Sequence, residues 1–345
     1  MNIESLFAAL NSMGQVATSA PPEIALQRSH APWYTRALMG GMGWLGGMLV
    51  LGFVGGIMGG LFDSAPGMAV VAVAMFAGSV AIYRTAPKND FATQFALAAS
   101  ICGQVLAAVA IGKMMSFNAG DAVIAWLVAL MQVVLVLVMP NFLHRLLSTL
   151  FVVAALFFAT RKNGLSVGVD LGLALGWVAL LWAESRLVAQ GRRALSEPVI
   201  NGLAVGLLAA GIGYMVLTEG EPWLPHTSLS STAFGAALLV WVVLATAGLA
   251  AATRAAAVAA TLAFVVVSWR APGLLASGLV LLASFAAGRR ALSALGLVSL
   301  LGYLSAYYYQ MSLSLLDKAG VLGLTGAVLL VLWWVHRHYF SKEPV

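Results

Sequence analysis

Residues 121–139 read DAVIAWLVALMQVVLVLVM, and this stretch decides the class of the fold. Asp121 at its start is its only charged residue, and Gln132 near its middle is its only amide. A transmembrane helix needs about 20 mostly apolar residues to cross a hydrocarbon core of about 30 Å. The stretch is therefore expected to be a membrane-spanning helix that carries one amide near its centre.

Similar apolar runs recur along the whole chain. Of its 345 residues, 61% are hydrophobic and 9% are charged, whereas a soluble domain carries roughly 25% charged residues. This composition predicts an all-α integral membrane protein, a polytopic bundle of about twelve transmembrane helices. The expected spans are 38–61, 66–83, 91–111, 121–139, 141–160, 165–185, 197–217, 231–252, 255–269, 272–288, 291–309 and 320–336. The ninth and tenth are short, so ten or eleven full crossings remain alternatives.

The positions of the cationic residues predict the orientation of these spans. Lys and Arg collect in cytoplasmic loops. If the N-terminus is cytoplasmic, thirteen of the 18 Lys and Arg residues lie on the inner side. The remaining five are Lys113, Arg161, Lys162, Arg270 and Lys318. We therefore expect both termini in the cytoplasm, with the net charge of +6 facing anionic lipid. The sequence has no soluble basic region that could bind nucleic acid, so we expect no nucleic-acid partner.

The segment before the first span differs from the rest of the chain. Within residues 1–37, Ile3, Leu6, Leu10 and Met13 recur at helical spacing. No basic region precedes an apolar one, so the segment does not read as a signal peptide. We expect a cytoplasmic amphipathic segment at 1–37, which lies on the membrane or docks a partner. A polytopic membrane domain at 38–336 and a cytoplasmic tail at 337–345 follow.

The first expected span is unusually rich in glycine. Ten glycines lie between residues 40 and 60, and several of them are four residues apart. Small residues at this spacing share a helical face and let another helix backbone approach closely. Helix packing is the expected role, and a helix that slides or bends and a dimer face are alternatives. The residues expected on this face are Gly43, Gly47, Gly52, Gly56 and Gly60.

Three polar side chains lie inside expected spans. Asp170 lies about five residues into the sixth span, and ionisable residues within a membrane usually have functional roles. The alternative is that Asp170 reaches the headgroups or pairs with Arg161 or Lys162. Gln104 and Gln132 lie near the centres of the third and fourth spans. A hydrogen bond between them would join the two helices, or the pair would line a substrate path.

A second polar group is expected at the outer end of the eleventh span. Consecutive tyrosines on a helix point in different directions, so some of them are expected to face protein or a partner, while others anchor the helix at the headgroups. Arg270 is expected on the same side, where it could meet Asp317 or bind an anionic group. The residues of this outer face are Tyr307, Tyr308, Tyr309, Arg270, Asp317 and Lys318.

Motifs that carry soluble enzyme chemistry are missing from the sequence. It contains no phosphate-binding GxxxxGK[ST], no HExxH and no GxSxG. Cys102 is the only cysteine, and the five histidines are scattered. We therefore expect no catalytic residues, no metal, no cofactor and no enzymatic activity.

Six segments together resemble a known family: PWYTR at 32–36, SEPVINGL at 196–203, WRAPGL at 269–274, GRR at 288–290, LGYLSAYYYQ at 301–310 and LLDK at 315–318. The resemblance is to an uncharacterised family of bacterial polytopic membrane proteins, a domain of unknown function. Its members are often encoded beside a small membrane-anchored protein with a GDYxxLxY signature. The resemblance implies the bacterial inner membrane and such a partner, but no catalytic residues. Members often have Lys-Ser where this chain has Lys318-Ala319.

Three functions remain open on the sequence. The first is a transporter-like or exporter-like protein, which fits the number of spans and the carboxylate Asp170 within the membrane. The second is a non-catalytic membrane partner or scaffold for a small membrane-anchored protein, which fits the low polarity and the tyrosines. The third is a membrane-embedded lipid-modifying enzyme, which lacks recognisable catalytic residues. A polar cavity lined by Asp170, Gln104 or Gln132 would favour the first.

Overall fold

The computed structural model describes Ser12 and residues 33–57, 59–115, 120–160, 165–216, 225–269 and 271–310. All regular elements within these ranges are helices. The chain divides into two compact units, Met1–Ala110 and Ile111–Val345. No change in composition marks this division, because it falls within one continuous apolar helix. Most of the segment expected at 1–37 lies outside the described residues, which include only Ser12 and residues 33–37 of it. The span expected at 320–336 and the tail expected at 337–345 lie outside them altogether.

The first unit contains α3 (Trp33–Ile57), α4 (Gly59–Phe62), α5 (Ala65–Thr85) and most of α6 (Asp90–Met114). Polar side chains cap two of these helices. Ser64 accepts a hydrogen bond from the Gly67 amide at 3.2 Å, and Asn89 accepts one from the Ala92 amide at 3.0 Å. Such caps satisfy amides that have no partner within the helix. These caps explain why α5 and α6 begin directly after Ser64 and Asn89.

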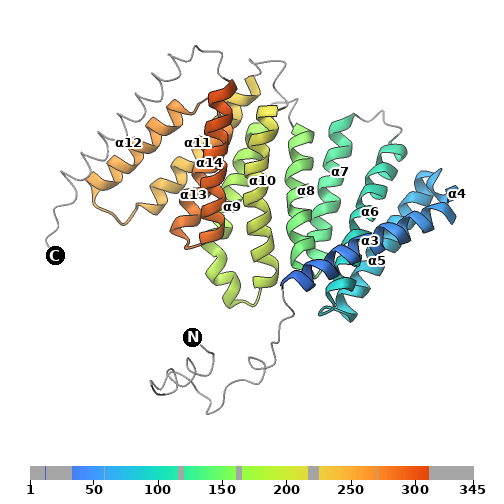
Figure 1. Ribbon diagram of the computed structural model, residues 1–345. Coiled ribbons are helices and arrows are strands. Elements are labelled where there is room, and N and C mark those ends of the chain that lie inside the picture. Colours follow the sequence, from blue (N-terminus) through green and yellow to red (C-terminus); the bar gives the residue numbers. More distant parts are fainter. Residues whose placement is uncertain are drawn as a thin grey trace. The chain divides into compact units, whose positions relative to one another are not determined.

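The second unit continues with a series of helices that run back and forth (Figure 1). Helix α8 packs against α7 and α10, while α11 packs against α9, α12 and α13. Helix α13 also packs against α14. The helices are α7 (Asp121–Val138), α8 (Phe142–Thr160), α9 (Ser166–Ala189), α10 (Arg193–Val216), α11 (Pro225–Ala245), α12 (Ala251–Val267), α13 (Pro272–Ala286) and α14 (Arg290–Gln310).

Two matching apolar stripes form the centre of the second unit. On α9 the stripe consists of Ala174, Trp177, Val178 and Leu181, and on α11 of Phe234, Ala237, Leu238 and Trp241. Both follow the spacing of one helical face. The Trp177 indole is fully buried and donates to the Ile200 carbonyl of α10 at 3.0 Å. The core therefore ties α9 to both α10 and α11.

Lengths and compositions identify the chain as a helical membrane protein. Six described helices are long and apolar enough to cross a membrane: α5, α6, α7, α8, α9 and the first 19 residues of α10. Shorter apolar helices lie at 230–245, 251–267, 272–286 and 290–306. Large apolar side chains such as Val267 and Phe285 face outward, as lipid-facing residues do. Each expected span from 38–61 to 291–309 overlaps a described helix, and the all-helical membrane fold is confirmed. The span expected at 231–252 is wrong at its end, because α11 ends at Ala245 and α12 begins at Ala251.

Candidate functional site

Asp170 lies in the second turn of α9 and is buried inside the second unit, with 4% of its surface exposed. Ser166 precedes it by one turn on the same helical face and is fully buried. Ala174, the first residue of the apolar stripe of α9, follows it by one turn. The carboxylate thus continues a buried stripe and does not reach the surface of the unit.

Helix α11 carries a corresponding polar pair. Ser230 and Ser231 are both fully buried, and Ser230 precedes Phe234 of the apolar stripe by one turn. Within the described part of the chain, the hydroxyls of Ser166, Ser230 and Ser231 have no hydrogen-bond partner. We call the group of Ser166, Asp170, Ser230 and Ser231 the polar cap, because it continues the two stripes, by two turns on α9 and by one turn on α11.

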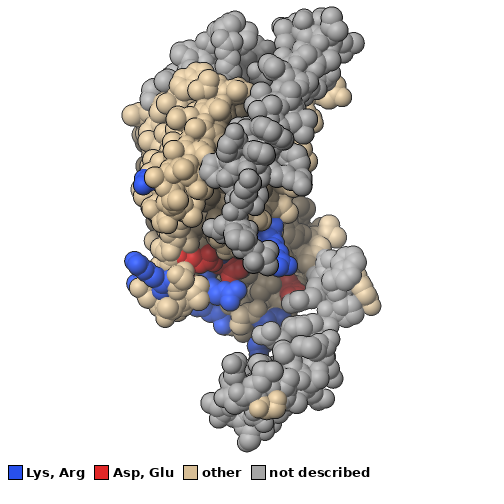
Figure 2. All heavy atoms as spheres, turned by 90° about the vertical axis from the view of Figure 1, so that its left-hand side faces the viewer, with Lys and Arg blue, Asp and Glu red and all other residues tan. Residues whose placement is uncertain are grey.

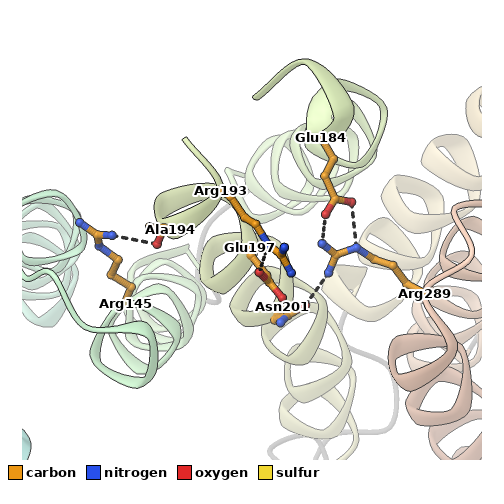
Figure 3. Close-up of polar contacts among 7 residues, drawn as sticks. All are labelled: Arg145, Glu184, Arg193, Ala194, Glu197, Asn201 and Arg289. Carbon is orange, nitrogen blue, oxygen red and sulfur yellow. Dashed lines mark hydrogen bonds and ion pairs between the residues drawn. The ribbon is translucent and has the colours of Figure 1, made fainter. Parts of the chain in front are cut away.

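A charged network joins three helices at the opposite end of α9. Arg289 forms a bidentate pair with Glu184, and its Nε lies 2.9 Å from Glu184 Oε2. Its Nη1 donates to Asn201 Oδ1 of α10, also at 2.9 Å. The two charged side chains are 17% and 26% exposed. Figure 3 shows the Arg289 guanidinium held between Glu184 and Asn201.

A glycine turn places Arg289 in this network. Gly288 has a φ of 70°, a left-handed conformation that glycine adopts without strain. The Gly288 amide donates to the Phe285 carbonyl at 3.0 Å, and the Arg289 amide donates to the Ser284 carbonyl at 2.9 Å. This pair of bonds is a Schellman ending of α13. The glycine at 288 therefore fixes the backbone position of Arg289, from which its side chain reaches Glu184 and Asn201.

A pocket of about 610 Å³ lies beside the charged network. Glu184 and Ser185 provide polar groups in its wall, and Trp182 and Trp241 provide aromatic ones. Its lining comes from α9, α11 and the end of α13. A second pocket, of about 310 Å³, is almost entirely apolar and lies between α8 and α10. Asp170, Gln104 and Gln132 line neither of these two pockets.

Further charged contacts lie near the start of α10. Arg193 pairs with Glu197 one turn later at 2.9 Å. Arg145 of α8 donates to the Val136 carbonyl of α7 at 3.0 Å and to the Ala194 carbonyl of α10 at 2.8 Å, so it joins three helices (Figure 3). On the face in Figure 2, most of the visible charged atoms gather in one band.

The two expected intramembrane amides are buried in different units. Gln104 lies on α6 and Gln132 on α7, with 6% and 3% of their surfaces exposed. In the first unit a different glutamine joins two helices, since Gln94 of α6 accepts from the Trp44 indole of α3 at 3.3 Å. A hydrogen bond between Gln104 and Gln132 stays a prediction.

The expected outer face is described only in part. Tyr309 is 81% exposed at the end of α14. The backbone of Tyr307 and Tyr308 continues the same helix, but their side chains are outside the described part of the structure. Arg270, Asp317 and Lys318 lie outside it altogether. The expected contact between Arg270 and Asp317 therefore stays a prediction.

The five glycines of the predicted packing face, four in α3 and Gly60 in α4, fall into two groups. A side chain at Gly43 would meet the Phe91 carbonyl oxygen at 2.7 Å, and one at Gly47 would meet Ala98 Cβ at 2.8 Å. Both contacts are with α6, so these two glycines allow close approach of the helices. Among the described residues, nothing lies within 4 Å of the corresponding position at Gly52, Gly56 or Gly60.

This difference predicts opposite effects for two identical substitutions. We expect Gly43→Ala to lower the free energy of unfolding of the first unit by about 1–2 kcal/mol, because the methyl group would push α3 from the α6 backbone. Gly52→Ala should be neutral or slightly stabilising, because alanine favours helix over glycine. Denaturation in SDS followed by circular dichroism would compare them. Equal effects would contradict the assignment of Gly43 to a packing contact.

No group of three His, Cys, Asp or Glu side chains that could hold a metal ion is found within the described ranges. The polar network around Arg289 was not predicted from sequence, although Glu184 near the end of an apolar run was a usable signal. The serines of the polar cap were also missed, because serine is common in membrane helices. Asp170 was found because a carboxylate stands out in an apolar run.

Comparison with known proteins gives a family but no activity. The family described as "Domain of unknown function (DUF4401)" matches residues 32–339. That range contains α3 through α14, and so includes the polar cap and the Arg289 network. No curated protein and no solved structure matches the chain.

Proposed function

This chain belongs to the DUF4401 family of unknown function, and from that premise we propose that it is a transporter-like protein of the bacterial inner membrane. In this proposal the chain has twelve spans and two cytoplasmic termini, and it performs no enzymatic catalysis. Asp170 is the ionisable group on which transport depends. Arg289, which precedes α14, holds the opposite end of α9 through Glu184 and binds α10 through Asn201.

The burial of Asp170 carries this proposal. A charged side chain within a membrane is costly, and carboxylates kept there face the protein interior and mark ion or substrate pathways. Asp170 is 4% exposed and lies on the buried face of a helix long and apolar enough to span. A carboxylate that reached the headgroups would be exposed on the surface of the unit. Its burial therefore favours transport over that alternative.

Cysteine labelling tests whether water reaches this carboxylate. Replacing the single Cys102 by alanine gives a background without thiols. We expect Ser166→Cys, one turn from Asp170, to react with a membrane-impermeant methanethiosulfonate in proteoliposomes. Ala174→Cys is the matched control, because it lies on the same face one turn further into the apolar core and is fully buried. We expect it to react at least tenfold more slowly.

Uptake measurements test transport directly. Proteoliposomes with an imposed ion gradient would be exposed to a bacterial metabolite extract, and the accumulated solutes identified by mass spectrometry. We expect at least one solute to accumulate with the native chain and not with Asp170→Asn. Uptake should persist in a Lys113→Gln control, which changes a charge in α6. If no solute accumulates above protein-free liposomes and Ser166→Cys is unreactive, the transporter-like proposal is wrong.

A second function is favoured by the exposed tyrosine at the end of α14. Tyr309 is 81% exposed, and Val298 and Leu301 are exposed on the same helix. We propose as the alternative that this helix binds a small membrane-anchored protein, for which the chain acts as a non-catalytic scaffold. Purification from native membranes with mass spectrometry of proteins and lipids would identify it. If the small protein still co-purifies with the variant that carries both Tyr308→Ala and Tyr309→Ala, this binding site is wrong.

A further inference from the structure

We propose that the pocket beside the Glu184–Arg289 pair binds an anionic phospholipid. One acyl chain would occupy the pocket, and the phosphate group would lie against Arg186 and Arg192. The inference goes beyond the function proposed above and does not depend on it. Four observations support it: a turn that occurs twice, arginines without acidic partners, the position of the pocket at helix ends and the apolar surface around its rim.

A turn with the sequence Gly-Arg-Arg-Ala-Leu-Ser occurs twice, at 191–196 and at 288–293. The first copy connects α9 to α10, and the second connects α13 to α14. The glycine has a φ of 73° in the first copy and of 70° in the second. In both copies the amide of the next residue, Arg192 or Arg289, donates at 2.9 Å to the carbonyl five residues earlier. The two arginines therefore begin from equivalent backbone positions.

The side chains around these two arginines differ. Arg289 is held by a glutamate of α9 and an asparagine of α10. Counted from the glycine of each copy, the corresponding residues of α13 and α14 are Leu281 and Val298, which offer no oxygen to a guanidinium. Arg192 is exposed and forms no ion pair within the described residues. Its guanidinium is therefore available to an anion that the chain does not supply.

Arginines outnumber acidic residues at this end of the helices. The segments 184–197, 245–254 and 287–290 contain six arginines and two glutamates. Each glutamate already forms an ion pair with one arginine. The other four arginines, among them Arg186 and Arg192, are exposed and have no ion-pair partner in the part of the chain that the structure describes. Such an excess of positive charge beside membrane helices attracts anionic lipid headgroups.

The pocket lies where membrane helices end. Its lining includes Val188 in the last turn of α9, Ala245 as the last residue of α11 and Ala286 as the last residue of α13. Helices α10, α12 and α14 begin within a few residues of these ends, so the opposite partial charges of the helix termini balance. The arginines therefore set the charge at this end. Trp182 and Trp241 in the pocket wall suit the boundary between headgroups and acyl chains.

The rim of the pocket continues into exposed apolar surface. Trp182 lines the pocket and is half exposed. Next to other lining residues, Leu244, Leu282 and Phe285 are 48%, 42% and 76% exposed. Contiguous exposed apolar surface of this kind marks contact with a membrane or a partner. The pocket volume of about 610 Å³ lies within the usual range of ligand sites. An acyl chain fits such a lining better than a soluble anion does.

Two arginines are placed to hold the headgroup. Helix α9 supplies half of the lining residues, and Arg186 lies between two of them, Ser185 and Val188. The Arg192 amide donates to the Leu187 carbonyl at 2.9 Å, so its backbone is tied to the same turn of α9. A guanidinium presents several donors in one plane, which match the oxygens of a phosphate group. These arginines are therefore assigned to the lipid phosphate.

Native mass spectrometry of the full chain tests the site. The protein would be delipidated in detergent and titrated with phosphatidylglycerol or with phosphatidylcholine of the same acyl chains. We expect one phosphatidylglycerol to bind roughly tenfold more tightly than phosphatidylcholine. The Arg186→Gln/Arg192→Gln variant should lose this preference. The matched control Arg84→Gln/Lys88→Gln removes two exposed cations from the first unit and should keep it.

Photo-crosslinking locates the acyl chain. Phosphatidylglycerol with a diazirine in its acyl chain is expected to label the segment 283–287, as mapped by peptide mass spectrometry. Ala286→Phe fills the rim of the pocket and should lose most of this labelling. Ala256→Phe adds the same side chain at an exposed position of α12 outside the pocket and should keep it. Both substitutions are at exposed positions, and thermal unfolding would check that both variants fold.

The results that would overturn the proposal are specific. Equal affinity of the native chain for the two lipids shows that the arginines do not select an anionic headgroup. An unchanged preference in Arg186→Gln/Arg192→Gln would refute the assignment of the phosphate. Excess inorganic phosphate should not displace the lipid. If it displaces the lipid and no label reaches the pocket, the arginines bind a soluble anion and the lipid site is wrong. None of these measurements depends on solute uptake, so they leave the transport proposal to its own test.

Discussion

Trp177→Ala is expected to lower the free energy of unfolding by about 3 kcal/mol. The Trp177 side chain is fully buried between α9, α10 and α11, and its indole donates to the Ile200 carbonyl at 3.0 Å. Lipid is as apolar as this core, so the loss comes from packing contacts and the hydrogen bond, not from transfer out of water.

Trp182→Ala is the matched control, because Trp182 lies on the same helix and is half exposed. We expect it to change the free energy of unfolding by less than about 1 kcal/mol. Reversible denaturation in mixed SDS and lipid micelles, followed by circular dichroism, would measure both. Similar midpoints for the two variants would show that α9 does not pack through its Trp177 face.

Arg289→Ala is expected to cost about 3 kcal/mol, because it leaves Glu184 partly buried without its guanidinium. The two side chains are 17% and 26% exposed, so water compensates for the lost pair only in part. The hydrogen bond to Asn201 at 2.9 Å disappears as well. We expect the variant to unfold at a lower SDS fraction, and the backbone amides at the end of α9 and at the start of α14 to exchange hydrogen faster.

Arg290→Ala is the control for this prediction. It removes the same charge one residue later, from an exposed position at the start of α14. A double-mutant cycle with Glu184→Gln would isolate the pair, and a coupling of about 2 kcal/mol is expected. The role of the network is refuted if Arg289→Ala and Arg290→Ala are equally stable.

The helices were predictable because charges and helix breakers bound the apolar runs. The run at 121–139 became α7 (Asp121–Val138), and the run at 272–288 became α13 (Pro272–Ala286). The largest shift is at the end of the span expected at 231–252, because α11 ends at Ala245. Other boundaries shifted where polar residues belong to the helix. Helix α10 begins at Arg193 instead of residue 197, because Arg193 and Glu197 pair within its first turns. Helix α11 begins at Pro225 instead of residue 231 for a similar reason: its first turns are polar.

The candidate site was only partly predictable. Asp170 stood out in the sequence by its charge. Ser166, Ser230 and Ser231 could not be predicted as part of the site, because only the folded structure shows that they are buried without hydrogen-bond partners. The Glu184–Arg289 pair joins residues that are 105 positions apart. No local pattern links such residues. Only the packing of α10 against α9, α13 and α14 brings them together.

That separation in sequence also sets a delay during synthesis of the protein. A ribosome adds about 5–20 residues per second, so roughly 5–20 seconds pass between the synthesis of Glu184 and that of Arg289. During that interval α9 and α10 are already made, but the carboxylate has not met its cation. The docking of α14 is therefore a late event in biogenesis. A nascent chain stalled before residue 289 should leave Glu184 accessible to a carboxyl-reactive reagent, which the finished protein would shield.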